Sequence, residues 1–98
     1  MNDDVMQGII LRHPQAIFRE VDEDVFLVHP DGVTIYNLNP TAAAIWRLMD
    51  QPNNEALSGM EMAEILSAAF PVISLERLQS DVKNVLGGLV NEGFAVKQ

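Results

Sequence analysis

The hydrophobic pattern changes its period once, at residues 38–40, and this change limits the folds open to the chain. Before it, from residue 15 onward, apolar residues fall in short alternating runs, which is typical of β-strands. After it, apolar residues recur every three or four positions, which is typical of amphipathic helices. The order predicts an α+β domain in which the strands come first and the helices follow.

Three strands are predicted in the first segment, at residues 16–21, 25–28 and 33–38. Acidic residues 22–24 are interpreted as a solvated turn. Residues 29–32, His-Pro-Asp-Gly, have the composition of a second turn, because Pro presets φ and Gly accepts a positive φ. The third strand alternates with apolar or aromatic side chains on both faces, so we expect neither face to be plainly solvated. Its two faces carry Val33 and Ile35 on one side, and Thr34, Tyr36 and Leu38 on the other.

Three helices are predicted in the second segment, each after a residue that caps helix N-termini. Asn39 precedes Pro40, Ser58 stands three residues before Glu61 in the spacing of a capping box, and Ser74 opens the last helix. The first helix is expected to end at residues 51–54, the second at Pro71, and the third at Gly93 with Phe94 folding back. A short terminal strand follows at residues 95–96. The apolar stripes are Ala42, Ile45, Trp46 and Met49; Met62, Ile65, Leu66, Ala69 and Phe70; and Leu78, Val82, Val85, Leu86 and Leu89.

Composition narrows the function classes. The 98 residues suffice for one domain, and the chain has no cysteine, which excludes a disulfide framework and a thiolate site. The formal charge of −8 argues against nucleic-acid binding, which needs a basic face. No apolar run is long enough to span a membrane, and the acidic start is unlike a signal peptide, so we expect a cytoplasmic protein.

No catalytic or metal-binding constellation stands out in the sequence. His13 and His29 have no ligand partners at a suitable spacing, and each stands beside a proline, so both are interpreted as structural turn residues. Ser58 and Ser74 are accounted for as caps. We therefore expect a protein without enzymatic activity, cofactor or metal.

The third predicted helix raises two questions. Its balance of two basic against three acidic residues disfavours a role in reading DNA. It also contains Gly87 and Gly88, which together cost about 1–2 kcal/mol relative to alanine. Either another backbone, from this domain or a partner, approaches closely there, or the helix bends.

The third predicted strand is the remaining candidate for function. It is short, uncharged and directly followed by a helix, so it is suited to a sheet edge. A peptide could add to that edge as a further strand, or a terminal segment or a second copy of the domain could cover it. The residues alone leave these readings open.

The segment from Gly32 to Trp46 resembles the PqqD family of pyrroloquinoline quinone biosynthesis and its relatives, the peptide-recognition domains of ribosomal peptide modification systems. The resemblance rests on Leu38-Asn39 followed by Thr41-Ala42-Ala43, and extends over residues 16–96 through Phe70-Pro71, Asp81-Val82 and Gly93-Phe94. The chain departs from the family in a longer connection at residues 52–57. That departure leaves open whether its peptide is the quinone precursor or that of another pathway.

The resemblance implies a three-stranded antiparallel sheet followed by three helices, similar to a winged helix-turn-helix. It implies that the leader of a precursor peptide adds to the third strand beside the third helix and is presented to a modifying enzyme, often a radical S-adenosylmethionine (SAM) protein. The residues it assigns to peptide binding are Val33, Thr34, Ile35, Tyr36, Asn37, Leu38, Leu78, Asp81, Val82 and Val85.

The charge distribution adds one expectation. Residues 32–41 carry no charge, whereas the rest of the chain is strongly acidic, so the leader or the enzyme that receives it is expected to be basic. The alternative function is a small acidic protein–protein adaptor or a self-associating domain, with the strand edge forming a homodimer.

Overall fold

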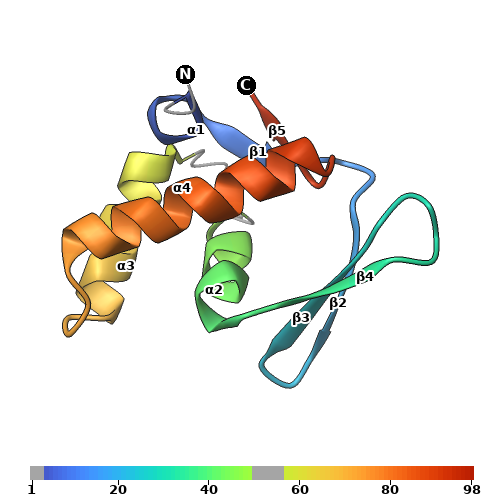
Figure 1. The fold of residues 1–98 in the computed structure, drawn as a ribbon, viewed down its shortest axis with the longest axis horizontal. Helices are drawn as coiled ribbons and strands as arrows, with labels where there is room; N and C mark the ends of the chain where they lie inside the picture. Colours follow the sequence, from blue (N-terminus) through green and yellow to red (C-terminus); the bar gives the residue numbers. More distant parts are fainter. Residues whose placement is uncertain (1–3, 50–56) are drawn as a thin grey trace.

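The computed structural model of the chain describes residues 4–49 and 57–98. Within these ranges the fold is α+β, with a hairpin sheet followed by three long helices, as the change of period predicts (Figure 1). No helix in this part of the chain is long and apolar enough to cross a membrane. The elements are α1 (Asp4–Gln7), β1 (Ile10–Arg12), β2 (Ile17–Val21), β3 (Asp24–Val28), β4 (Ile35–Leu38), α2 (Pro40–Leu48), α3 (Gly59–Ala69), α4 (Leu75–Asn91) and β5 (Ala95–Lys97).

The main sheet has the antiparallel order β2-β3-β4, which confirms the three predicted strands. In β3, Val25 and Leu27 are fully buried and face the helices, while Phe26 and Val28 on the other face are half-buried. Phe26 pairs with Asn37 of β4, and Val28 pairs with Ile35. Since directly paired residues share a face, the sheet has one face against the core and one face without a covering helix.

The predicted caps are all present. The Asn39 side chain accepts a hydrogen bond from the Ala42 N–H, Ser58 and Glu61 form a complete capping box, and Ser74 accepts from the Arg77 N–H. Gly93 has φ +85°, and the Phe94 N–H returns to the Leu89 carbonyl, so α4 ends as predicted. The predicted end of the first helix, at residues 51–54, lies outside the described residues.

A second, two-stranded sheet was not expected from the sequence. The predicted terminal strand is present as β5, and it pairs with β1, whose three residues are too short to show a period. Arg12 at the end of β1 places its guanidinium over the rings of Phe18 and Trp46, with centroid distances of 4.7 and 4.4 Å, and donates to the Trp46 carbonyl at 2.7 Å. These contacts attach the small sheet to the core, where Trp46 is fully buried.

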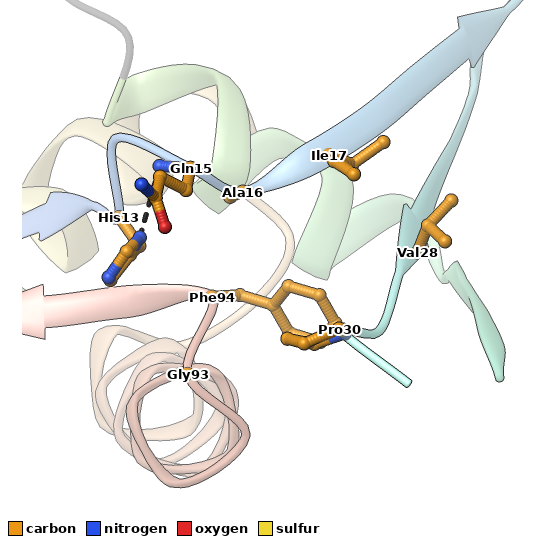
Figure 2. A pocket seen from close by; sticks show the side chains of 8 residues that line it. All are labelled: His13, Gln15, Ala16, Ile17, Val28, Pro30, Gly93 and Phe94. Carbon is orange, nitrogen blue, oxygen red and sulfur yellow. Dashed lines mark hydrogen bonds between the residues drawn. The ribbon is translucent and has the colours of Figure 1, made fainter. Parts of the chain in front are cut away.

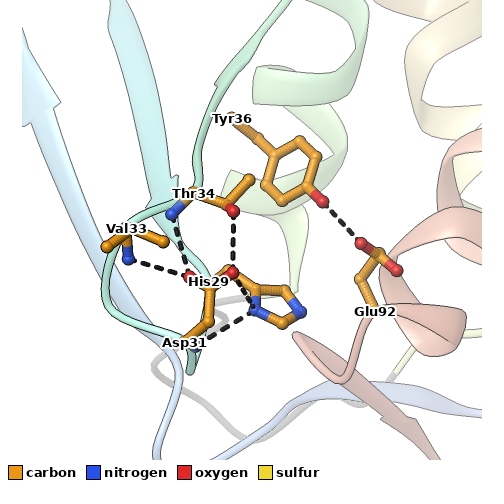
Figure 3. Close-up of polar contacts among 6 residues, drawn as sticks. All are labelled: His29, Asp31, Val33, Thr34, Tyr36 and Glu92. Atoms are coloured by element: carbon orange, nitrogen blue, oxygen red, sulfur yellow. Dashed lines mark hydrogen bonds and ion pairs between the residues drawn. The ribbon is translucent and has the colours of Figure 1, made fainter.

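The turn before β4 explains why this strand is shorter than predicted. The Asp31 carboxylate accepts hydrogen bonds from the N–H groups of Val33 and Thr34, at 2.8 and 2.9 Å, and from the Thr34 hydroxyl at 2.7 Å (Figure 3). Both N–H groups therefore bind a side chain instead of a strand, and β4 begins at Ile35. These bonds favour the charged form and lower the pKa of Asp31 from 3.8 to about 2.

Asp31 should make the stability of the fold depend on pH below 3.8, the ordinary pKa of its carboxyl group. Because its pKa is lowered in the folded state, its contribution is present above pH 3.8 and is lost as the pH falls toward 2. We expect an NMR titration of the side-chain carboxyl carbon to have its midpoint near 2. The difference in denaturant midpoint between wild type and Asp31→Asn should shrink over the same range. A carboxyl titrating near 3.8 would contradict this.

Gly59 should be intolerant of any side chain. A Cβ at this position would lie 2.6 Å from the Val5 carbonyl oxygen and 2.9 Å from the Met6 Cα, so the backbone of α1 would have to move. We expect Gly59→Ala to lower the free energy of unfolding by about 1–3 kcal/mol. The matched control is Gly87→Ala, where a Cβ meets nothing within 4 Å and helix propensity should raise stability by about 1 kcal/mol. Thermal melts of both variants measure the difference, and equal shifts would contradict the prediction.

Candidate functional site

Strand β4 lies at an edge of the main sheet, as predicted for the third strand. The His29 N–H donates to the Thr34 carbonyl, so this pair is a hydrogen-bonded one, and pair types alternate along an antiparallel ladder. The N–H and C=O groups of Ile35 and Asn37 therefore point away from β3. Among the described residues no strand pairs with this edge, which leaves those groups available to a further strand.

The other edge of the sheet is β2, and it is a poorer place to add a strand. All five of its residues are exposed, and two of them, Arg19 and Glu20, are charged. Glu20 is engaged by Arg47 of α2 at 2.9 Å. Charged side chains on an edge strand discourage pairing with another chain. Strand β4 has no charge and is the better candidate.

The two faces of β4 differ more than the sequence suggests. Tyr36 and Leu38 face the core and are half-buried, whereas Ile35 is 62% exposed and Val33, in the turn, is 82% exposed. The expectation that neither face is plainly solvated is therefore wrong. It fails because apolar side chains on the outer face lack a covering helix, and alternation alone cannot tell a covered face from a bare one.

A cavity of about 240 Å³ lies between the inner face of β4 and helix α4. Its walls are almost entirely apolar. The buried side chains of Leu27, Leu89 and Phe94 contribute to it. The remaining lining residues are Tyr36, Leu38, Ala42, Asn84, Val85, Gly88 and Glu92.

One hydrogen bond joins β4 to the end of α4 at this cavity. The Tyr36 hydroxyl donates to a carboxylate oxygen of Glu92 at 2.5 Å, across 56 positions of sequence (Figure 3). This bond, burial and the negative charge of Glu92 raise the pKa of Tyr36 above its ordinary 10.0, so the hydroxyl stays protonated and remains the donor. The Tyr36 ring also meets the Phe94 ring edge to face at 5.7 Å.

The residues that the resemblance assigns to peptide binding are only partly brought together. The stretch from Val33 to Leu38 forms the edge and its preceding turn, and Val85 lines the cavity. Asp81 is half-buried one turn before Val85, with a carboxylate oxygen 4.0 Å from Arg77. Leu78 and Val82, by contrast, are fully buried in the hydrophobic core and expose no surface.

The α4 residues that line the cavity, which form the α4 wall, are Asn84, Val85, Gly88, Leu89 and Glu92, and of these the sequence pointed only to Val85 as a site residue. Asn84 and Glu92 line the cavity, and their involvement depends on how far along the helix β4 crosses, which no local pattern encodes. Gly88 also lines it, and it was marked in the sequence only by its unfavourable helix propensity.

A second cavity, of about 440 Å³, lies at the end of the sheet and is also lined by Phe94 (Figure 2). It is lined by His13, Gln15, Ala16, Ile17, Val28, Pro30, Gly93 and Phe94.

His13 is used within its own turn, where its Nδ1 accepts a hydrogen bond from the Gln15 N–H, and the Nδ1 of His29 accepts one from the Asp31 N–H. Both histidines are thus turn residues, as interpreted from the sequence. In residues 4–49 and 57–98 no three His, Asp or Glu side chains are grouped to hold a metal ion.

Comparison with known proteins identifies the fold and the family. The family model described as Coenzyme PQQ synthesis protein D (PqqD) matches residues 24–95. None of the curated proteins matches the chain. The structure of TbiB1 in complex with the TbiA(β) leader peptide is similar with a TM-score of 0.72 at 19% identity, over 87% of this chain and 93% of that one.

A second similar structure is the PqqD truncation of Methylobacterium extorquens PqqCD, described as a functional, stand-alone RiPP (ribosomally synthesized and post-translationally modified peptide) recognition element. Its TM-score is 0.72 at 15% identity, over 96% of this chain and 98% of that one. Both likenesses confirm the fold class expected from the sequence. Since the family model covers most of the chain and the fold agrees with it, the chain belongs to the PqqD family.

Proposed function

We propose that this domain binds the leader segment of a ribosomally made precursor peptide and presents it to a modifying enzyme. The observation that carries the proposal is the unpaired edge of β4 beside the cavity formed with α4. Membership of the PqqD family supports it, as does the similar fold of TbiB1, which was determined with a leader peptide.

In this proposal the leader adds to β4 as a further strand. The N–H and C=O groups of Ile35 and Asn37 form the new ladder, each bond contributing about 0.5–1.5 kcal/mol. Alternate side chains of the leader face the cavity, where burying one large apolar side chain contributes about 1.5–3 kcal/mol. Because β4 is only four residues long, the buried side chains contribute a large share of the affinity.

The binding residues follow from this geometry. Residues 33–38 supply the edge, and Val85 belongs to the α4 wall together with the cavity residues Asn84, Gly88 and Glu92. Asp81 lies one turn before Val85, at the end of this wall. Leu78 and Val82 act behind that wall, because they are fully buried and hold α4 against the core. Glu92 and Asp81 place negative charge on the wall, which favours a leader with basic residues near its apolar one.

The domain acts without catalysis in this proposal, and the chemistry belongs to the enzyme that receives the peptide. We infer a radical SAM enzyme in the cytoplasm as that partner, because the family resemblance links such domains to these enzymes. The net charge of −8 favours a partner surface with basic residues.

An alternative is self-association through the uncovered face of the sheet. Ile17, Val28 and Ile35 form a row across its three strands, and Ile17 and Ile35 are 60% and 62% exposed. This row favours self-association through the open face of the sheet, and not through the strand edge that was expected from the sequence. Sedimentation at several concentrations separates the two: a tight dimer that added peptide leaves unchanged supports self-association.

Ile35→Pro should abolish strand addition while sparing the hairpin, because the N–H it removes points away from β3. The probe is the tightest binder from a display library of random twelve-residue peptides selected on the wild-type chain. We expect at least about tenfold weaker binding, since the peptide loses a donor and meets a proline ring. The matched control is Ile35→Ala, which keeps the N–H and should bind within about threefold.

Changes in the backbone amide shifts of the ¹⁵N-labelled chain on adding peptide show where the peptide binds. With wild type they should fall on residues 33–38 and on the α4 residues at the cavity. Shifts confined to β2, or equal loss of affinity in both Ile35 variants, would contradict strand addition at β4.

A further inference from the structure

Gly87 and Gly88 stand in the interior of α4, and the fold itself requires neither. A Cβ built on either residue meets no atom within 4 Å, so none of the described residues approaches the helix closely there. The helix continues unbroken from Leu75 to Asn91 through both positions (Figure 1). Each glycine nevertheless costs about 1 kcal/mol relative to alanine.

The two glycines differ in where they lie. Gly88 is exposed and lines the cavity between β4 and α4, whereas Gly87 is half-buried and is not part of that lining. Gly88 is one turn after Asn84 and one turn before Glu92, so a side chain there would stand in the middle of the α4 wall. The open space at Gly88 is therefore space inside the proposed peptide site.

We propose that Gly88 determines the specificity of this site, by leaving room for one aromatic side chain of a strand added to β4. The inference rests on the proposed function. In an added strand, residues that share the inner face with Tyr36 and Leu38 fall between β4 and α4. The α4 residues that line the cavity are Asn84, Val85, Gly88, Leu89 and Glu92, and among them only Gly88 lacks a side chain to obstruct such an occupant.

The chemistry of the walls favours an aromatic occupant over an aliphatic one. At the base of the cavity the rings of Tyr36 and Phe94 meet edge to face, at 5.7 Å and 82°. A third ring can extend this arrangement, and such pairs contribute beyond the area they bury. The Glu92 carboxylate at the same end attracts a basic residue beside the aromatic one.

The test compares peptide selections on three chains: wild type, Gly88→Ala and Gly87→Ala. Each is used to select from a display library of random twelve-residue peptides. Wild type and Gly87→Ala should both enrich peptides with an aromatic residue at one position. Gly88→Ala should enrich smaller side chains at that position, because its methyl group occupies the space. The tightest wild-type peptide should bind Gly88→Ala at least about tenfold more weakly and Gly87→Ala within about twofold.

Two controls make the result decisive. Both variants should melt at or above the wild-type temperature, which separates lost space from lost fold. Replacing the aromatic residue of the selected peptide by valine should weaken its binding to wild type. The same peptide should then bind Gly88→Ala more tightly than it binds wild type. If Gly88→Ala selects the same peptides with the same affinity, or if Gly87→Ala is weakened equally, the role of Gly88 is overturned. If wild type enriches no peptide, the proposed function itself fails and this inference falls with it.

Discussion

The functional edge depends on how a four-residue strand is held at both of its ends. Before β4, the Asp31 carboxylate binds two backbone N–H groups and a hydroxyl, and after it, the Asn39 side chain caps the helix that follows immediately. Short side chains thus supply the bonds that a longer strand would obtain from neighbours. The strand is thus fixed in place although no described residue pairs with its outer edge, which is the condition for adding a strand there.

Helix α4 has two functional faces, one packed in the core and one lining the cavity. Leu78, Val82, Leu86 and Leu89 are buried and anchor the helix to the core. The adjoining face, from Asn84 to Glu92, forms one wall of the cavity, where Asn84 and Glu92 place polar groups beside Val85, Leu89 and the bare backbone of Gly88. A rigid helix held by one face can keep the other at a constant distance from β4, which is how a groove remains open in a domain this small.

The sequence predicts well those features that depend only on residues close together in the chain. The caps at Asn39, Ser58 and Ser74, the exit at Gly93 and the three hairpin strands all follow from local chemistry and are found in the structure. It predicts poorly what long-range packing decides. The β1–β5 pairing and the bond from Tyr36 to Glu92 each depend on the position at which distant segments cross. The apolar stripe correctly marks Leu78 and Val82 as apolar-face residues, but not that they lie too deep to touch a peptide. A helical stripe can identify an apolar face but not how much of that face the sheet covers.

Phe94 has a consequence for the shape of the domain. It is 3% exposed, and its ring is a wall of the cavity beside α4 and also of the larger cavity at the end of the sheet (Figure 2). A single buried side chain is therefore shared by the two cavities. Shortening Phe94 would enlarge both cavities together and remove the ring against which Tyr36 packs, so the shape of the peptide groove is coupled to that of the larger cavity through one aromatic side chain.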